Sequence, residues 1–196
     1  MGLARFAVVD IETSGLSTRR HRILQVAVVT ALADGTVVDE WSSYVKLRRP
    51  WSRVGPRRVH GISRRTLKGA PDAAAVLAEL SARLDGTVFT AHNARFDAGF
   101  LRREAQRRGI GLDLHRQLCT LTLSRRLDPE RQLTHGLADV CQRYGVRIER
   151  HHDALHDARA TASVLPHLLA AADVTDDESL APWLWTPHRR GGAHRS

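Results

Sequence analysis

The sequence predicts an α/β domain with a mixed sheet, and three observations along the chain predict it. Three strand-like segments come first, at 5–11, 22–32 and 36–47. Helical and strand-like segments then alternate from about residue 71 to residue 120, and the pattern stays helical up to residue 171. Strand hairpins followed by alternating helices and strands are typical of a mixed sheet that α-helices flank.

The first three segments are rich in β-branched apolar residues, which favour strands. Segment 5–11 reads RFAVVDI and runs into acidic residues. A turn with the Asp-Gly hairpin signal, Ala33-Asp34-Gly35, separates the second segment from the third. We therefore expect the three strands to form an antiparallel meander.

The middle of the chain begins with an expected loop at 48–61, which is rich in Arg, Pro and Gly. A short helix capped by Ser63 is expected to end near Gly69. A longer helix is predicted from Pro71 to Leu84, because apolar residues recur there at helical spacing. The remaining expected elements are strands at 87–92 and 114–120 and helices near 94–108, 120–127, 136–144 and 153–171.

The folded domain is expected to span residues 1–171. From Ala172 the periodic pattern is lost, and the segment turns acidic, then carries Trp and Pro, then becomes basic. We interpret residues 172–196 as a poorly ordered C-terminal tail.

Composition indicates one globular domain, since the chain has 196 residues of which 42% are hydrophobic. No apolar run approaches the ~20 residues of a membrane helix. The segment from Met1 to Asp10 lacks the regions of a signal peptide, so a cytoplasmic protein without membrane contact is the expectation. Cys119 and Cys141 show no metal-ligand spacing and imply no disulfide framework, and we expect both in the core.

The charge balance favours a polyanionic partner. The chain has 30 Lys and Arg against 21 Asp and Glu, which gives a formal net charge of +9. A surplus of this size suits nucleic acid. Lys46 and Lys68 are the only lysines, however, and an Arg-for-Lys bias also arises from genome composition.

Three clusters of polar residues suggest chemistry. In the first, Asp10 and Glu12 flank Ile11 at the end of an apolar strand, and residues i and i+2 of a strand point to the same face. Two carboxylates side by side repel, so a buried pair calls for a cation, and Mg²⁺ or Mn²⁺ takes such oxygen ligands. The alternative is a solvated loop just past the strand.

The second cluster is Asp97, early in the helix after the fourth strand. Phe96, Phe100 and Leu101 supply an apolar face, which leaves Asp97 toward the mouth of the sheet. The alternative is a first-turn Asp that complements the helix dipole.

The third cluster, HDALHDA at 152–158, places His152 at the start of the last helix and Asp157 within it. A neutral His beside a metal cluster can take a proton from water. A solvated helix start and a histidine zinc site are the alternatives, and zinc ranks low because no Cys is nearby.

Taken together and in order, VVDIETSGL, HNARFDAGFL and HDALHDARATA resemble the three motifs of the DEDDh exonuclease family. Within it the chain is most similar to the epsilon proofreading subunits of bacterial replicative DNA polymerase and their stand-alone relatives. The resemblance covers about residues 5–170. It implies an RNase H-like fold, a five-stranded mixed sheet flanked by helices.

The resemblance also implies a reaction and its residues. Asp10, Glu12, Asp97 and Asp157 match the acidic positions that hold two divalent cations, Mg²⁺ or Mn²⁺, and His152 matches the general base. None of the five is substituted. The implied activity is 3′→5′ hydrolysis of terminal phosphodiesters, which releases nucleoside 5′-monophosphates.

Further residues match family segments that meet the substrate. Thr13 would hydrogen-bond the terminal sugar, and Leu16 would wedge against the last base, although a minor core contact explains Leu16 equally well. His60 in VHGI, and His92 and Asn93 in the second motif, would lie near the substrate, with a hydrogen-bonded core residue as the alternative for His92.

Arginine pairs flank the expected site region and would track phosphates without reading sequence, while ordinary solvated charge remains the alternative for most of them. Trp51 in the same region would stack on a base. The arginine pairs that flank the expected site are Arg48-Arg49, Arg57-Arg58 and Arg64-Arg65.

The motifs leave three functions open. The first is a DNA exonuclease of proofreading or repair that acts on single strands or frayed 3′ ends. The second is an RNA exonuclease that uses the same site. The third is a non-catalytic nucleic-acid-binding module, against which the intact set of five residues argues. The chain carries no polymerase region, so association with a separate polymerase stays open. The oligomeric state stays open as well, because no interface can be identified from the sequence.

Overall fold

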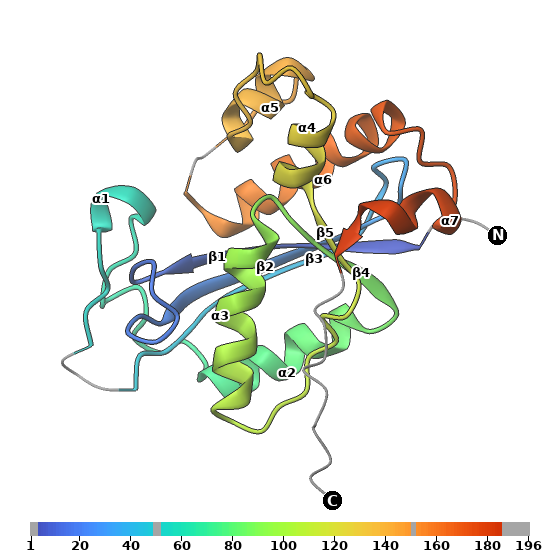
Figure 1. Ribbon diagram of the computed structural model, residues 1–196. Helices are drawn as coiled ribbons and strands as arrows, with labels where there is room; N and C mark the ends of the chain where they lie inside the picture. Colours follow the sequence, from blue (N-terminus) through green and yellow to red (C-terminus); the bar gives the residue numbers. More distant parts are fainter. Residues whose placement is uncertain (1–3, 49–51, 150–151, 186–196) are drawn as a thin grey trace, which may run out of the picture.

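A computed structural model describes residues 4–48, 52–149 and 152–185. One mixed sheet has the strand order β3-β2-β1-β4-β5-β6, and helices cover both of its faces (Figure 1). The strands are β1 (Arg5–Thr13), β2 (Ile23–Ala31), β3 (Val37–Tyr44), β4 (Thr87–Ala91), β5 (Gln117–Cys119) and β6 (Leu184–Trp185). The helices are α1 (Arg57–His60), α2 (Ala73–Leu84), α3 (Ala94–Gln106), α4 (Thr120–Arg126), α5 (Leu137–Arg143), α6 (Ala154–Ala171) and α7 (Asp177–Leu180), and a 3₁₀ turn spans Ala181–Trp183.

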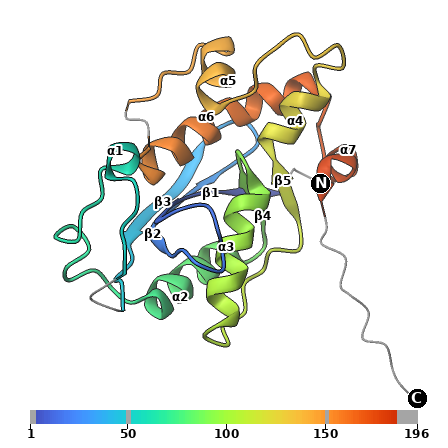
Figure 2. The ribbon, with the colours of Figure 1, turned by 60° about the vertical axis from the view of Figure 1, so that its left-hand side comes forward.

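The two faces of the sheet bury different sets of side chains because side chains alternate along a strand. On β1, Phe6 and Val8 pack with α4, α5 and α6, whereas Val9 and Ile11 pack with α2 and α3. The layers are visible in Figures 1 and 2, where α2 and α3 lie on one side of the sheet and α4, α5 and α6 on the other. The α/β class with a mixed, helix-flanked sheet is confirmed.

The antiparallel meander is confirmed as well. Strand β2 pairs antiparallel with both β1 and β3, and β1 pairs parallel with β4, as β4 does with β5. In the hairpin turn, the Thr36 amide donates to the Asp34 carboxylate at 2.8 Å, which fixes the turn locally. All of β2 is buried, which explains its mostly apolar sequence.

Two local expectations between β3 and β4 are wrong. Residues 57–60 form the short helix α1 inside the expected loop, and Gly61 ends it in the left-handed region at a φ of 69°. The segment after Ser63 makes turns and no regular helix, although Ser63 caps it as expected: its hydroxyl accepts from the Thr66 amide, and the Thr66 hydroxyl accepts from the Ser63 amide. Helix α2 begins at Ala73, two residues after the predicted Pro71, with Asp72 accepting from the amides of Ala74 and Ala75.

Within the described residues the sheet has six strands, one more than expected, because the C-terminal segment adds β6. Residues 184–185 pair antiparallel with β5, and α7 precedes them. The Arg126 guanidinium lies 4.0 Å from the Trp183 ring centroid and donates to the Pro182 carbonyl. Residues 172–185 thus pack on the domain, in contrast to the expected disorder, while residues 186–196 lie outside the described residues.

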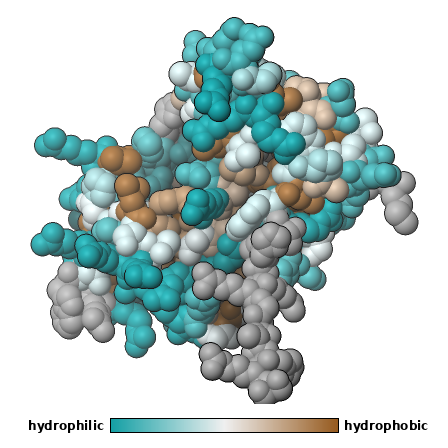
Figure 3. All heavy atoms as spheres, viewed as in Figure 1, coloured by the Kyte–Doolittle hydropathy of each residue, from teal (hydrophilic) through white to brown (hydrophobic). Residues whose placement is uncertain are grey.

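The face of the molecule that Figure 3 shows is mostly polar. Figure 3 shows hydrophilic side chains over most of one face, with hydrophobic ones exposed in small separate patches. Among the described residues, no helix has both the length and the apolar character that crossing a bilayer requires.

Candidate active site

The first two carboxylates project from the end of β1. Asp10 and Glu12 share a strand face with Val8, and both are half-buried. The pairing with β2 shifts register between Glu12 and Thr13, and the strand ends one residue later, at Thr13. The carboxylates therefore stand at the mouth of the sheet, where a buried apolar strand gives way to a loop.

Asp97 reaches the same place from the opposite layer. It lies in the first turn of α3 and is only 4% exposed. Strand β4 pairs with β1 no further than Val8, so β1 extends beyond it. Ile11 lies past the end of that ladder, and its backbone amide acts to lower the pKa of Asp97, against the larger effect of burial. The strand offset thus positions Asp97 next to β1.

The third motif enters from α6. Asp153 caps this helix by accepting from the Leu155 amide, and Asp157 is buried one turn later. His152 has a left-handed backbone with a φ of 60°, and its amide donates to the Asp157 carboxylate at 3.0 Å. The turn that carries the exposed His152 is therefore held by the Asp157 carboxylate.

The carboxylates perturb one another strongly. Burial, followed by the charges of Asp97, Asp157 and Glu12, raises the pKa of Asp10 well above its ordinary value. Burial, followed by the charge of Asp157, raises the pKa of Glu12 to about 8. Burial also raises the pKa of Asp97 to about 7, although backbone hydrogen bonds oppose it. These pKa values rise because burial and neighbouring like charges both disfavour the ionised form of a carboxyl group.

The donor set fits divalent cations. One ligand atom from each of Glu12, His152 and Asp157 lies within 4.8 Å of the other two. Asp10 and Asp97 interact with the same group through their charges. A set dominated by carboxylate oxygens suits Mg²⁺ or Mn²⁺, and a cation held there would offset the repulsion that raises their pKa values. Sequence reasoning had expected these five residues together, and the fold brings them together.

A hollow of about 300 Å³ opens beside this cluster, lined by Tyr44, His60, His152, Asp153 and residues of α1. Figure 2 shows α1 beside the start of α6. His60 is buried, with Nε2 3.0 Å from the Val54 carbonyl and Nδ1 accepting from the Ile62 amide. Its ring is thus fixed at the wall of the hollow.

Two more expected substrate residues follow Glu12. Leu16 is 84% exposed, so the core-contact alternative does not hold for it. Thr13 is buried, and its hydroxyl donates to the Gly15 carbonyl at 2.9 Å. That bond shapes the loop that presents Leu16 to solvent.

Asn93 and His92, the two expected substrate residues of the second motif, differ in exposure and in hydrogen bonding. Asn93 is exposed at the start of α3 and makes no capping hydrogen bond through its side chain. His92 lies 3.0 Å from the Thr120 hydroxyl and 2.9 Å from the His135 carbonyl through its two ring nitrogens. This matches the alternative of a hydrogen-bonded core histidine, and a substrate role for His92 stays a prediction.

Sequence reasoning gave no role to Asp153 and Tyr44. Asp153 raises the pKa values of Asp10 and Glu12 after larger contributions from burial and nearer carboxylates. Its place directly before a helical pattern is an N-cap signal, which would have found its position but not its neighbours. Tyr44, at the end of β3, carried no signal. Trp51 lies outside the described residues.

Comparison with known proteins decides the family. The family model described as Exonuclease (RNase_T) matches residues 7–165. The chain belongs to this exonuclease family. Its expected place among the DEDDh 3′→5′ exonucleases, similar to epsilon, is thereby confirmed, and the match spans all three acidic motifs.

This exonuclease also resembles longer bacterial proteins. It is 34% identical over 166 residues to a PolC-type DNA polymerase III of Staphylococcus saprophyticus, and 32% identical over 173 residues to that of Halalkalibacterium halodurans. The matches cover 85% and 88% of this chain but only 11% and 12% of those proteins. The exonuclease thus spans a small part of these relatives.

Solved structures agree on the fold. Exonuclease X in complex with 5′ overhanging duplex DNA has a TM-score of 0.68 at 25% identity, over 91% of this chain and 97% of that one. The nuclease domain of 3′hExo, a DEDDh family member bound to rAMP, has a TM-score of 0.73 at 14% identity, over 88% and 95%. The RNase H-like architecture is confirmed, and the family implies divalent metal ions.

Proposed function

We propose that this exonuclease removes nucleotides one at a time from the 3′ end of single-stranded or frayed DNA, in proofreading or repair. The observation that carries the proposal is the meeting of Asp10, Glu12, Asp97 and Asp157 with His152 at one end of the sheet. An acidic cluster in a chain with a net charge of +9 suits a substrate that is a polyanion and a reaction that needs cations.

The reaction is hydrolysis of the terminal phosphodiester. Water attacks phosphorus, the bond from phosphorus to the 3′ oxygen of the preceding nucleotide breaks, and that oxygen takes up a proton. The products are a nucleoside 5′-monophosphate and a chain shortened by one nucleotide. Two divalent cations held by the four carboxylates would activate the water and stabilise charge on the leaving oxygen.

The residues of the chain supply positioning and proton transfer. His152 accepts a proton from the attacking water, and its place on an exposed turn beside Asp157 puts the imidazole at the edge of the cluster. Leu16 packs against the terminal base, which its 84% exposure permits. Thr13, His60 and Asn93 line the path of the last nucleotide.

DNA is the favoured substrate because the relatives by sequence and a relative by structure both point to it. The longer relatives are named as DNA polymerases, and Exonuclease X was solved with DNA. The polymerase relatives also support association with a polymerase and a cytoplasmic location. The second candidate is trimming of RNA, which the rAMP bound to 3′hExo favours, since that nuclease has the same fold.

The test uses oligonucleotides labelled at the 5′ end. Single-stranded DNA, a mismatched primer–template and RNA of equal length are incubated with Mg²⁺ or with Mn²⁺. We expect a ladder that shortens from the 3′ end, fastest on single-stranded DNA, and no products with chelator or with Asp10→Ala. Internal cleavage, or cleavage that survives Asp10→Ala, would refute the proposed reaction. Faster cleavage of RNA would assign the second candidate.

A further inference from the structure

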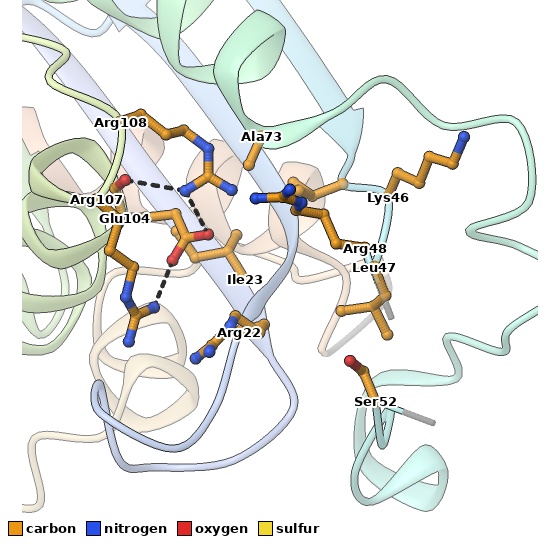
Figure 4. A pocket seen from close by; sticks show the side chains of 11 residues that line it. Arg22, Ile23, Lys46, Leu47, Arg48, Ser52, Ala73, Glu104, Arg107 and Arg108 are labelled. Carbon is orange, nitrogen blue, oxygen red and sulfur yellow. Dashed lines mark hydrogen bonds and ion pairs between the residues drawn. The ribbon is translucent and has the colours of Figure 1, made fainter. Parts of the chain in front are cut away.

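A second hollow, of about 410 Å³, lies away from the catalytic carboxylates. It opens between the end of α3, the start of α2 and the chain that follows β3 (Figure 4). Its wall carries five cationic side chains, Arg22, Lys46, Arg48, Arg107 and Arg108, and one carboxylate, Glu104. Five cations in one hollow repel each other, so the arrangement suits a ligand that carries several negative charges.

Two of these arginines are held in place from within the protein. Glu104 is buried, and its carboxylate lies 2.8 Å from the guanidinium of Arg107 and 2.8 Å from that of Arg108. One carboxylate shared by two guanidinium groups leaves a net positive charge. Both arginine side chains are less than a third exposed, which separates them from freely solvated surface charge.

The opposite wall adds further positive charge. Figure 4 shows Arg48 pointing across the opening toward Arg108, with Arg22 below them, while the ammonium of Lys46 points outward. The nearby Asp72 is engaged elsewhere, because it caps α2. Backbone hydrogen bonds from Ala75 and Ala74, and then the charges of Arg108 and Arg48, lower its pKa.

The hollow is connected to the active site through the loop after Glu12. The Arg107 guanidinium donates to the carbonyls of Thr18 and Arg19 at 3.4 and 3.2 Å. This loop also carries the exposed Leu16. Both sites therefore border the same loop.

Helix α3 sets the separation between the two sites. Asp97 lies in its first turn, and Glu104 to Arg108 follow seven to eleven positions later. Arg107 and Arg108 lie just past the helix end at Gln106, which is nine positions after Asp97, and at 1.5 Å per residue this offset is roughly 14 Å. Successive phosphates of a stacked strand are about 3.4 Å apart along the axis, so this offset corresponds to roughly three to five phosphates.

We propose that the hollow around Arg48 and Arg108 binds backbone phosphates of the substrate strand, about three to five nucleotides from the bond that is cleaved. The inference rests on the proposed function, since it assumes a nucleic-acid strand whose 3′ end lies at the carboxylates. Guanidinium groups bind phosphate oxygens in pairs of hydrogen bonds, which suits a backbone contact without sequence preference.

The test compares a strand that reaches the hollow with one that does not. Fluorescein-labelled dT12 and dT3 are bound in chelator, where cleavage does not occur, and affinity is measured by fluorescence anisotropy at several salt concentrations. The variant is Arg48→Ala/Arg108→Ala. The matched control is Arg5→Ala/Arg147→Ala, which removes two exposed arginines from other parts of the surface. The single variant Arg48→Ala, at an exposed residue, guards against misfolding of the double variant.

We expect the double variant to weaken dT12 binding about tenfold and to reduce the salt slope by about 1.4, since each lost phosphate contact removes about 0.7 on a single strand. Affinity for dT3 should change less than twofold, and the control should leave the preference for dT12 unchanged. Equal losses on dT3 and dT12, or an equal loss in the control, would overturn the inference. Cleavage of dT12 with Mn²⁺ is measured separately, and its absence in the unmodified protein would refute the proposed function while the binding result still decides the hollow.

Discussion

Replacing Asp97 by Asn should stabilise the metal-free protein. The pKa of Asp97 is raised from 3.8 to about 7, first because burial disfavours its charge. One pKa unit corresponds to about 1.36 kcal/mol, so an ionised Asp97 costs the folded state about 4 kcal/mol. Asn keeps an oxygen that can accept from the Ile11 amide and removes the charge. The charge of Asp97 is also the second cause, after burial, of the raised pKa of Asp10. The substitution therefore removes one source of repulsion on the Asp10 carboxylate.

The gain in stability from Asp97→Asn should increase with pH. The folded pKa of Asp97 exceeds its ordinary value of 3.8, so the folded state binds more protons than the unfolded state between pH 3.8 and about 7. The stability of the unmodified protein therefore falls as pH rises through that window. The advantage of Asp97→Asn should be about 1 kcal/mol at pH 4.5 and about 4 kcal/mol at pH 8.

Urea unfolding in chelator at both pH values measures this difference. At pH 8 the variant should also melt about 10 °C higher. Asp85→Asn, at the exposed C-terminal end of α2, is the control and should change stability by less than about 0.5 kcal/mol. With Mn²⁺ the unmodified protein should gain more stability than Asp97→Asn. A variant that is less stable at pH 8 in chelator, or equally stabilised at both pH values, would refute the reasoning.

Three further predictions concern the base, a loop contact and the C-terminal segment. His152→Ala should slow hydrolysis about 10²–10⁴-fold while Mn²⁺ still raises the melting temperature, and a full rate would exclude it as the base. Gly55→Ala should destabilise the protein and raise KM. Gly55 has a φ of 78°, and a Cβ added there would lie 2.4 Å from the Ser14 carbonyl oxygen. The control Gly61→Ala, at a glycine with open space around it, should change KM little. Leu180→Ala should cost about 2–4 kcal/mol in urea unfolding, since Leu180 is fully buried, and an unchanged midpoint would show that residues 172–185 do not contribute to the core.

The candidate site could be predicted from the sequence because its three acidic motifs occur in the family's order, while each motif read singly left an alternative open. Asp10 and Glu12 end an apolar strand, Asp97 lies in the first turn of a helix, and Asp157 lies within another. Strand alternation and helical spacing act between residues a few positions apart, so the sequence alone determines which face each side chain takes. The hairpin turn and the cap of α2 were predictable for the same reason.

Tertiary structure alone decided the sixth strand, the hydrogen bonds of His92 and the cationic hollow. Residues 184–185 became a strand because β5 offered a free edge more than 60 positions earlier. Arg48 and Arg108 share a hollow because the end of α3 packs beside the chain after β3. Such contacts join segments far apart in the sequence, where neighbouring residues carry no signal of the partner. The sequence thus determined the chemistry of the exonuclease, and the packing of distant elements decided what surrounds it.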